Sequence, residues 1–201
     1  MGSLDTTPVM KVEKFTLDDI PDAIAMNYAA FQGEESQKMM PDTVGARQWW
    51  IDVYRHDYLN RQQHSHFIKV VETSGGAMVA YARWDRASLE ERGPRYPAWH
   101  ADMDHTACDL FMEQSDGTRR RLMGTEPHYF LDTVVTHPAY QGKGAGSMLV
   151  KWGCDLADQE GVAVYVDASD VGASLYQRFG FEARQAPGNE YAVLVRKARS
   201  A

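Results

Sequence analysis

The segment Val135-Thr136-His137-Pro138-Ala139-Tyr140-Gln141-Gly142-Lys143-Gly144-Ala145-Gly146 joins an apolar, strand-like run to a helix-like one. A strand is predicted over residues 128–137, Pro138 ends it, and an amphipathic helix is predicted from Gly144 to about residue 159. Glycines let backbone amides approach a ligand closely, and the unpaired amides and dipole of a helix's first turn attract anions. The segment therefore predicts a cradle for phosphate groups.

Two other nucleotide sites also use glycine-rich loops. The phosphate loop of nucleoside triphosphatases ends in Gly-Lys-Ser/Thr, and Gly142-Lys143-Gly144 lacks the hydroxyl after the lysine. A dinucleotide-binding fingerprint places its glycines in the first β-α-β unit, with an acidic residue at the end of the next strand. Asp167 would suit that position, but four predicted strands precede the glycines here. A nicotinamide-dependent enzyme stays open as an alternative.

The cradle segment resembles the signature of the GNAT superfamily of N-acetyltransferases, whose core reads Gln/Arg-x-x-Gly-x-Gly/Ala. A second segment, Ser169-Asp170-Val171-Gly172-Ala173-Ser174-Leu175-Tyr176-Gln177-Arg178-Phe179-Gly180-Phe181, is similar to the family's Asn-x-x-Ala-x-x-Leu-Tyr-x-x-x-Gly-Phe. The sequence departs from that pattern at Ser169 and Gly172, where Asn and Ala are common. The resemblance is strong over about 55 residues, and the two motifs have the family's spacing.

The resemblance implies an acyl-CoA-dependent enzyme with a single mixed, mostly antiparallel sheet (an α/β fold of the α+β type). It also implies a splayed central pair of parallel strands and helices on both faces. Acetyl-CoA is then the co-substrate, and its pantetheine arm pairs with the backbone of Val134, Val135 and Thr136. The residues implied to bind its pyrophosphate are Gln141, Gly142, Lys143, Gly144, Ala145, Gly146 and Ser147. Ser169 is implied to donate to the pantetheine amide, and it could equally cap the helix that follows.

Acetyl transfer to an amine requires a base for the ammonium proton, polarisation of the thioester carbonyl and a proton donor for the thiolate. The resemblance implies that Tyr176 is the donor, and a core tyrosine is the alternative. Asp132 is implied to be the base, because several relatives carry a Glu or His there. An aspartate in an apolar strand needs a partner or a polar cleft, so a salt-bridged Asp132 is the other interpretation. Phe130, at the other position where relatives keep a base, cannot titrate.

The expected function is therefore transfer of an acetyl group from acetyl-CoA to a primary amine of a small molecule or peptide by direct attack. Neither Cys108 nor Cys154 lies where a thiolate would be activated, which disfavours a covalent route. A non-catalytic domain that senses acyl-CoA is the alternative. The acceptor and the oligomeric state, monomer or homodimer, are left open.

Further along the chain, β-rich runs predict strands at 9–15, 67–72, 77–84, 163–167, 181–184 and 191–196. Helical spacing predicts helices at 16–33, 47–60 and 171–179. From residue 85 to 127 the periodicity is lost, and Pro94, Pro97, Gly117 and Gly124 interrupt the segment. We expect a single domain over residues 1–201, in which 1–8 are disordered and 85–127 form a long insertion with some helix over the site.

Composition limits the partners and the cellular compartment that are expected for this protein. The formal net charge of -7 argues against a nucleic-acid partner, and no apolar run approaches the roughly 20 residues that span a bilayer. Met1-Gly2-Ser3-Leu4-Asp5-Thr6 matches an N-myristoylation pattern, but no basic cluster adds the second signal for membrane anchoring. Two cysteines make no disulfide framework, so a cytoplasmic protein is expected.

No metal is expected. His64 and His66 share one strand face without an assignable third ligand, and zinc usually needs at least three protein ligands. A second group, His100, Asp102, Asp104, His105 and Asp109, falls in the irregular insertion and has no family counterpart.

Overall fold

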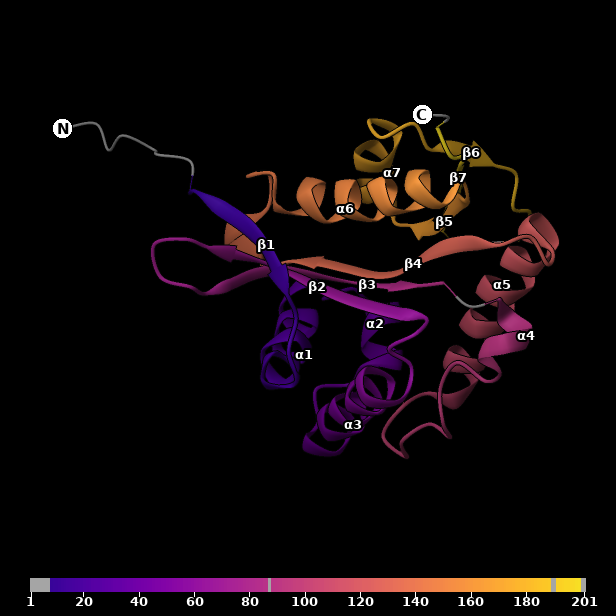
Figure 1. The fold of residues 1–201 in the computed structure, drawn as a ribbon. Helices are drawn as coiled ribbons and strands as arrows, with labels where there is room; N and C mark the ends of the chain where they lie inside the picture. The colour runs from indigo at the N-terminus through magenta and orange to yellow at the C-terminus, as the bar shows by residue number, and fades with distance from the viewer. Residues whose placement is uncertain (1–7, 87, 189–190, 200–201) are drawn as a thin grey trace.

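The computed structural model describes residues 8–86, 88–188 and 191–199, and these residues build one seven-stranded sheet of order β1-β2-β3-β4-β5-β7-β6 (Figure 1). Residues 1–7, including the myristoylation-like start, lie outside the described residues. Only β4 and β5 run parallel among the described strands. The expected mixed, mostly antiparallel sheet is confirmed. The strands are β1 Met10–Lys14, β2 Ser65–Glu72, β3 Met78–Asp85, β4 His128–Thr136, β5 Ala163–Ala168, β6 Glu182–Arg184 and β7 Ala192–Arg196.

Helices cover both faces of this sheet. Figure 1 shows α6 and α7 on one face and α1, α2 and α3 on the other, with α4 and α5 at one end. Short 3-10 turns at Leu17–Asp19 and Pro138–Tyr140 precede α1 and α6. The helices are α1 Ile20–Ala30, α2 Glu34–Met39, α3 Val44–Asn60, α4 Leu89–Arg92, α5 His105–Met123, α6 Ala145–Glu160 and α7 Asp170–Gln177.

The parallel pair β4 and β5 separates after three residue pairs, the last of which is Phe130 with Tyr165. Beyond this point β4 stays paired with β3 as far as Thr136, and β5 stays paired with β7 as far as Ala168. The facing edges of the two strands therefore no longer bond to each other. We call this opening the split.

A bulge lies in β4 at the beginning of the split. Arg83 pairs with Thr133 and Trp84 pairs with Leu131, so Asp132 is an extra residue with no partner position on β3. A bulge of this kind bends its strand and interrupts the alternation of side chains. Consequently Asp132 and Thr133 both face the helical layer of α3, where Thr133 Oγ1 lies 3.4 Å from the hydroxyl of Tyr54.

The segment that precedes β4 is more regular than its sequence suggests. Gly117 was expected to interrupt it, but this glycine lies inside the 19-residue helix α5. Asp104 caps α5 by accepting a hydrogen bond from the amide of Ala107, and Met123 packs against Phe130 and Tyr165. These interactions outweigh the cost of about 1 kcal/mol for a glycine within a helix.

Candidate active site

The glycine-rich loop has the backbone that an anion cradle requires. Gly142 and Gly144 have φ angles of +74° and +95°, and a Cβ at either would meet no atom within 4 Å. Gly144 is the N-cap of α6, and in the described residues no side chain caps this helix end. The first-turn amides of α6 therefore have neither an intrahelical partner nor a side-chain cap among the described residues. Ala145 has a buried side chain and offers only its backbone.

Neighbouring side chains hold this loop against β4. The side-chain amide of Gln141 donates to the carbonyl oxygen of Thr136 at 3.5 Å, and Thr136 Oγ1 would lie 3.4 Å from a Cβ at Gly146. Lys143 Nζ lies 5.1 Å from the centroid of the Tyr140 ring, and Arg178 donates to Ser147 Oγ at 3.5 Å. The end of β4 and the beginning of α6 thus form one continuous surface.

The β4 edge that faces the split is the second part of the site. Val135 has a buried side chain that belongs to the core beneath α1 and α3, whereas Val134 and Thr136 are half-buried. Because β3 occupies the opposite edge of β4, the backbone groups that face β5 are available to a ligand. A strand edge left open in this way can pair with an extended molecule that carries amides.

Tyr176 and Ser169 approach the split from α7 and its N-terminus. Tyr176 is 4% exposed, and its ring centroid lies 5.6 Å from that of Phe181. Burial raises the pKa of the Tyr176 hydroxyl, so it keeps its proton at neutral pH. Ser169 Oγ accepts a hydrogen bond of 3.2 Å from the amide of Gly172, so it caps α7.

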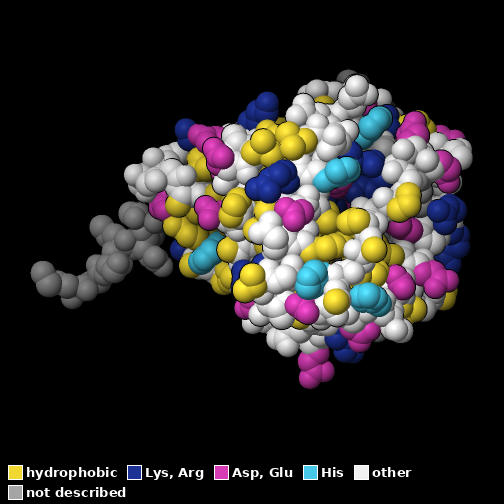
Figure 2. Space-filling model, turned by 90° about the horizontal axis from the view of Figure 1, so that it is seen from below, with side chains coloured by type: hydrophobic (Ala, Val, Ile, Leu, Met, Phe, Trp, Pro, Cys, Tyr) yellow, Lys and Arg dark blue, Asp and Glu magenta, His cyan; other side chains and the backbone are white. Residues whose placement is uncertain are grey.

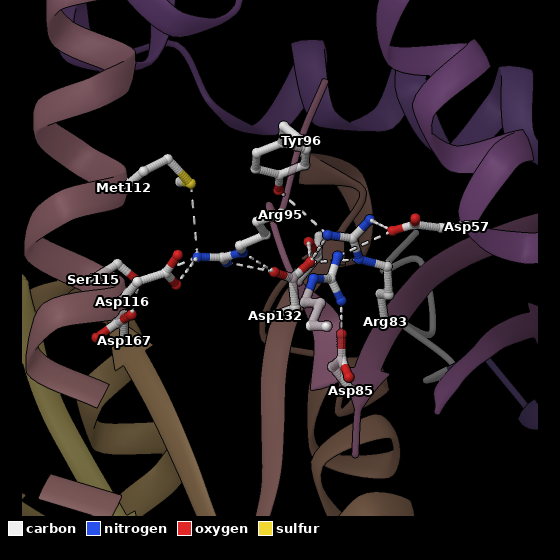
Figure 3. A network of polar contacts seen from close by, with 12 residues as sticks. Asp57, Arg83, Asp85, Arg95, Tyr96, Met112, Ser115, Asp116, Asp132 and Asp167 are labelled. Carbon is white, nitrogen blue, oxygen red and sulfur yellow. Dashed lines mark hydrogen bonds and ion pairs between the residues drawn. The ribbon is translucent and has the colours of Figure 1, made fainter. Parts of the chain in front are cut away.

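Asp132 lies in a network of buried charges (Figure 3). Its carboxylate pairs with Arg83 and Arg95, and its side chain is only 1% exposed. Burial alone would raise the pKa of Asp132, but the charges of Arg83 and Arg95 outweigh it and hold that pKa below its usual value. Arg83 also reaches Asp57 at 3.1 Å. A carboxylate stabilised in this way binds protons weakly, which disfavours Asp132 as a general base.

Asp167 on β5 is a second carboxylate at the split, and sequence reasoning did not assign it to acetyl transfer. Its oxygens accept hydrogen bonds from Ser115 at 2.6 Å and from Tyr165 at 2.7 Å. Burial raises the pKa of Asp167, and these two hydrogen bonds oppose the shift without cancelling it. The available signal was a single acidic residue in the apolar run Ala163–Ala168.

A cavity of about 320 Å³ passes through the split. Tyr176, Ser169 and Val134 line it on the side of α7, and Asp132 and Asp167 line it within the split. Towards α1 and α3 its walls are aromatic and methionine side chains, and hydrophobic groups gather near the middle of that surface (Figure 2). The cavity joins the open edge of β4 to an apolar chamber.

The described residues contain no group of three or more His, Cys, Asp or Glu side chains placed to hold a metal ion. In the same part of the chain, no helix is long and apolar enough to cross a membrane.

Comparison with known proteins identifies the family. Residues 26–181 match the Acetyltransferase (GNAT) family, so the chain belongs to this family. Its members use acetyl-CoA as the acetyl donor. The resemblance carried by the two sequence motifs is thereby confirmed.

Individual relatives agree with this assignment. An acetyltransferase of Stachybotrys chartarum is 32% identical over 90 residues, which is 45% of this chain and 38% of that relative. A histone acetyltransferase HPA2 and related acetyltransferase from Corynebacterium glutamicum has a TM-score of 0.62 at 19% identity, covering 96% of this chain and 98% of that one. An insect protein described as arylalkylamine N-acetyltransferase 7, from the yellow fever mosquito, has a TM-score of 0.71 at 13% identity, covering 94% and 87%. The two structures show the shared fold.

Proposed function

We propose that this protein moves an acetyl group from acetyl-CoA to a primary amine of a small molecule or peptide by direct attack. The observation that carries the proposal is the cavity through the split, which joins the open edge of β4 and Tyr176 to an apolar chamber. Such a passage lets two substrates meet from opposite faces of one sheet. Holding the amine and the thioester close together within the split then favours direct transfer.

The chain offers a fitting surface to each part of the donor. Gly142, Gly144 and the first-turn amides of α6 suit a pyrophosphate, since they combine close backbone approach with a favourable dipole. Gln141, Lys143, Ala145, Gly146 and Ser147 complete this cradle in the proposal. The backbone of Val134, Val135 and Thr136 suits the amides of the pantetheine arm. Ser169 lines the cavity beside them and contributes its hydroxyl, although that hydroxyl also caps α7.

Two groups of the protein act on the thioester in this proposal. Backbone amides of β4 at the split polarise the carbonyl, because they are fixed donors in a site shielded from water. Tyr176 donates its proton to the departing thiolate, for which a neutral hydroxyl is required. Burial raises the pKa of Cys108 and of Cys154 to about 11, which supports direct attack over an acetylated cysteine.

The test is thiol release from acetyl-CoA across a panel of primary amines, with calorimetry of CoA binding alongside. Turnover with at least one amine is expected, together with an N-acetylated product by mass spectrometry. Saturable CoA binding without turnover on any amine would support the sensor alternative instead. If the protein neither binds CoA nor turns over any amine, the proposed acetyl transfer is overturned for this chain. An NADH titration would then test the nicotinamide alternative.

A further inference from the structure

The proposed reaction needs a group that receives a proton from the acceptor's ammonium. Two carboxylates lie at the split, Asp132 on β4 and Asp167 on β5. Each is two residues beyond the last β4–β5 pair, Phe130 with Tyr165, so both project from the same face of the sheet. Their surroundings differ, and this difference separates their roles.

Asp132 is already neutralised by the protein. One oxygen accepts hydrogen bonds from Arg83 and from Thr133, and the other accepts from Arg95. Receiving a proton would remove the charge that holds two buried guanidiniums. Figure 3 shows Arg95 between Asp132 on one side and Ser115 with Asp116 on the other. Asp132 therefore positions arginines at the edge of the cavity.

Asp167 instead accepts hydrogen bonds from neutral groups. Its two hydrogen-bond donors are the neutral hydroxyls of Ser115 and Tyr165, and none of the ion pairs among the described residues includes it. It is half-buried and lines the cavity, so a ligand can reach it. Each oxygen has accepted one hydrogen bond and retains capacity for an ammonium donor.

Several elements of the fold place charged groups near Asp167. Helix α5 contributes Asp116 and Arg119, the segment before α5 contributes Arg95, and β4 contributes Asp132. Arg95 lowers the pKa of Asp167 and Asp116 raises it, but burial is the largest influence and the pKa is raised overall. A carboxylate with a raised pKa is better matched to proton transfer near neutral pH than one with a depressed pKa.

Asp167 and Tyr176 approach the split from opposite faces of the sheet. Asp167 bonds to Ser115 on α5, whereas Tyr176 packs in the core with α6 and lines the same cavity. An amine bound at Asp167 would therefore meet a thioester bound beside Tyr176 within the split. This arrangement separates the proton acceptor from the proton donor.

The chamber next to Asp167 is apolar. Trp99 packs on Tyr96 with ring centroids 5.4 Å apart, and Tyr96 packs on Trp50 at 5.3 Å. The charged residues among the described lining are Arg95, Asp132 and Asp167, and the first two form an ion pair. Among these lining residues the formal charges sum to -1, and Asp167 is the charged lining residue outside the ion pair. Further lining comes from Phe31, Met39, Met40, Phe111 and Met112.

We propose that the Asp167 carboxylate binds the ammonium of the acceptor and takes its proton, and that this acceptor has an apolar, ring-sized body without negative charge. The inference rests on the proposed function. The first ammonium proton passes to Asp167, and the nitrogen lone pair forms the bond to the carbonyl carbon as the carbon–sulfur bond breaks. The thiolate takes the Tyr176 proton, the second nitrogen proton restores Tyr176, and the proton on Asp167 leaves to solvent. One proton is released per turnover.

The test compares two acceptors of nearly equal shape but different basicity, 2-phenylethylamine and O-benzylhydroxylamine. For Asp167→Asn we expect kcat/KM to fall by about 100-fold or more with the strongly basic amine. With the weakly basic alkoxyamine the fall should be no more than a few-fold, because its nitrogen is already neutral. Glu113→Gln, an exposed position on the same helix as Ser115, is the matched control and should behave as wild type. Equal losses for both acceptors, or no loss, would overturn the role of Asp167.

The acceptor class is tested with 2-phenylethylamine against phenylalanine, which differs by one carboxylate. We expect kcat/KM to be at least about tenfold higher for 2-phenylethylamine, since the negative charge of Asp167 repels the carboxylate of phenylalanine. Equal rates would overturn this part of the proposal. CoA affinity of Asp167→Asn, measured by calorimetry, should match wild type and thereby show an intact donor site.

A second measurement does not depend on turnover. In protein with 13C-labelled aspartate carboxyls, the signal absent from Asp167→Asn should titrate above the ordinary aspartate value of about 3.9. Adding 2-phenylethylamine should lower this midpoint, because an ammonium stabilises the carboxylate. A midpoint at or below the ordinary value that the amine leaves unchanged would reject Asp167 as the ammonium site. Wild type that is inert towards every amine would instead count against the proposed function.

Discussion

Gly153 of α6 lies so close to the indole of Trp84 on β3 that a Cβ at position 153 would be 2.2 Å from Trp84 Cζ2. Trp84 is fully buried, and its ring belongs to the core between the sheet and α6. The absence of a side chain at 153 therefore sets how closely α6 approaches β3. Because the glycine-rich loop leads into the N-terminus of α6, this contact helps to place the proposed phosphate cradle.

Replacing Gly153 with alanine should destabilise the protein, because a buried tryptophan and a helix backbone must move apart. We expect a loss of about 1–3 kcal/mol in the free energy of unfolding, measured by urea denaturation. Gly117→Ala in α5 is the matched control, since a Cβ there meets no atom within 4 Å. This control should stabilise the protein by about 0.5–1 kcal/mol. Similar effects at the two positions would contradict the described packing.

Replacing Tyr176 with phenylalanine should lower kcat by about 10- to 100-fold, which is the loss expected for a positioned proton donor. The ring and its contact with Phe181 are retained, so thermal stability and CoA affinity should stay near those of wild type. Steady-state kinetics with the amine found in the panel would measure the effect. An undiminished kcat would leave Tyr176 as a packing residue.

Replacing Gly144 with aspartate should weaken CoA binding by at least about tenfold, or about 1.4 kcal/mol. The substitution brings a negative charge to the cradle and forces a side chain into a left-handed conformation with φ of +95°. Gly144→Ala shares the backbone strain without the charge and separates the two causes. Calorimetry on both variants is the measurement. Unchanged affinity in both would reject the cradle as the phosphate site.

Replacing Asp132 with asparagine should reduce stability by about 3–5 kcal/mol, because the buried charges of Arg83 and Arg95 would both lose the carboxylate that they share. Asp155→Asn, which removes only an exposed pair with Lys151, should change stability by no more than about 1 kcal/mol. Chemical denaturation at neutral pH compares the two. A stable Asp132→Asn variant that loses only turnover would favour Asp132 as the base.

His128 should make stability depend on pH between about 6.5 and 4. Burial lowers the pKa of His128 to about 4 from the usual 6.5, so the unfolded chain binds more protons in this window. Stability is therefore greatest above pH 6.5 and falls by about 3 kcal/mol as the pH drops through the window. The slope should be smaller in His128→Gln and unchanged in His56→Gln, whose side chain is 70% exposed. Urea denaturation at several pH values measures it.

The glycine-rich turn before α6 and the helix α7 could be predicted from the sequence, because the residues that specify them lie close together in the chain. Glycine spacing after a strand, and the Leu175-Tyr176 and Gly180-Phe181 pattern, lie within one continuous stretch. The order of the strands followed from alternation and turns. The structure of residues 85–127 could not be predicted in this way, because α5 packs against Tyr165, which is distant in the sequence.

The roles of the two carboxylates show the same limit. From sequence, Asp132 and Asp167 are each one acid in an apolar strand, and family position alone favoured Asp132. What separates them is supplied from elsewhere in the chain: Arg83 and Arg95 for Asp132, and the Ser115 hydroxyl for Asp167. Pairing across such distances leaves no periodic signal in the sequence.

The bulge at Asp132 divides β4 into two parts, in which the alternation of side chains between the two faces of the sheet is shifted by one residue. Before the bulge, Tyr129 lies on the α6 face of the sheet and Phe130 on the opposite face, against α5. After the bulge, Val134 lies on the α6 face and Val135 on the opposite face, against α1 and α3. A substitution at residue 132 leaves the alternation of side chains unchanged in both parts. Deletion of this one residue would give the strand a single, continuous alternation. Either Tyr129 and Phe130 or Val134 and Val135 would then move to the opposite faces of the sheet. A substitution at this position therefore changes the charge network but preserves the alternation of side chains, whereas a deletion would disrupt that alternation.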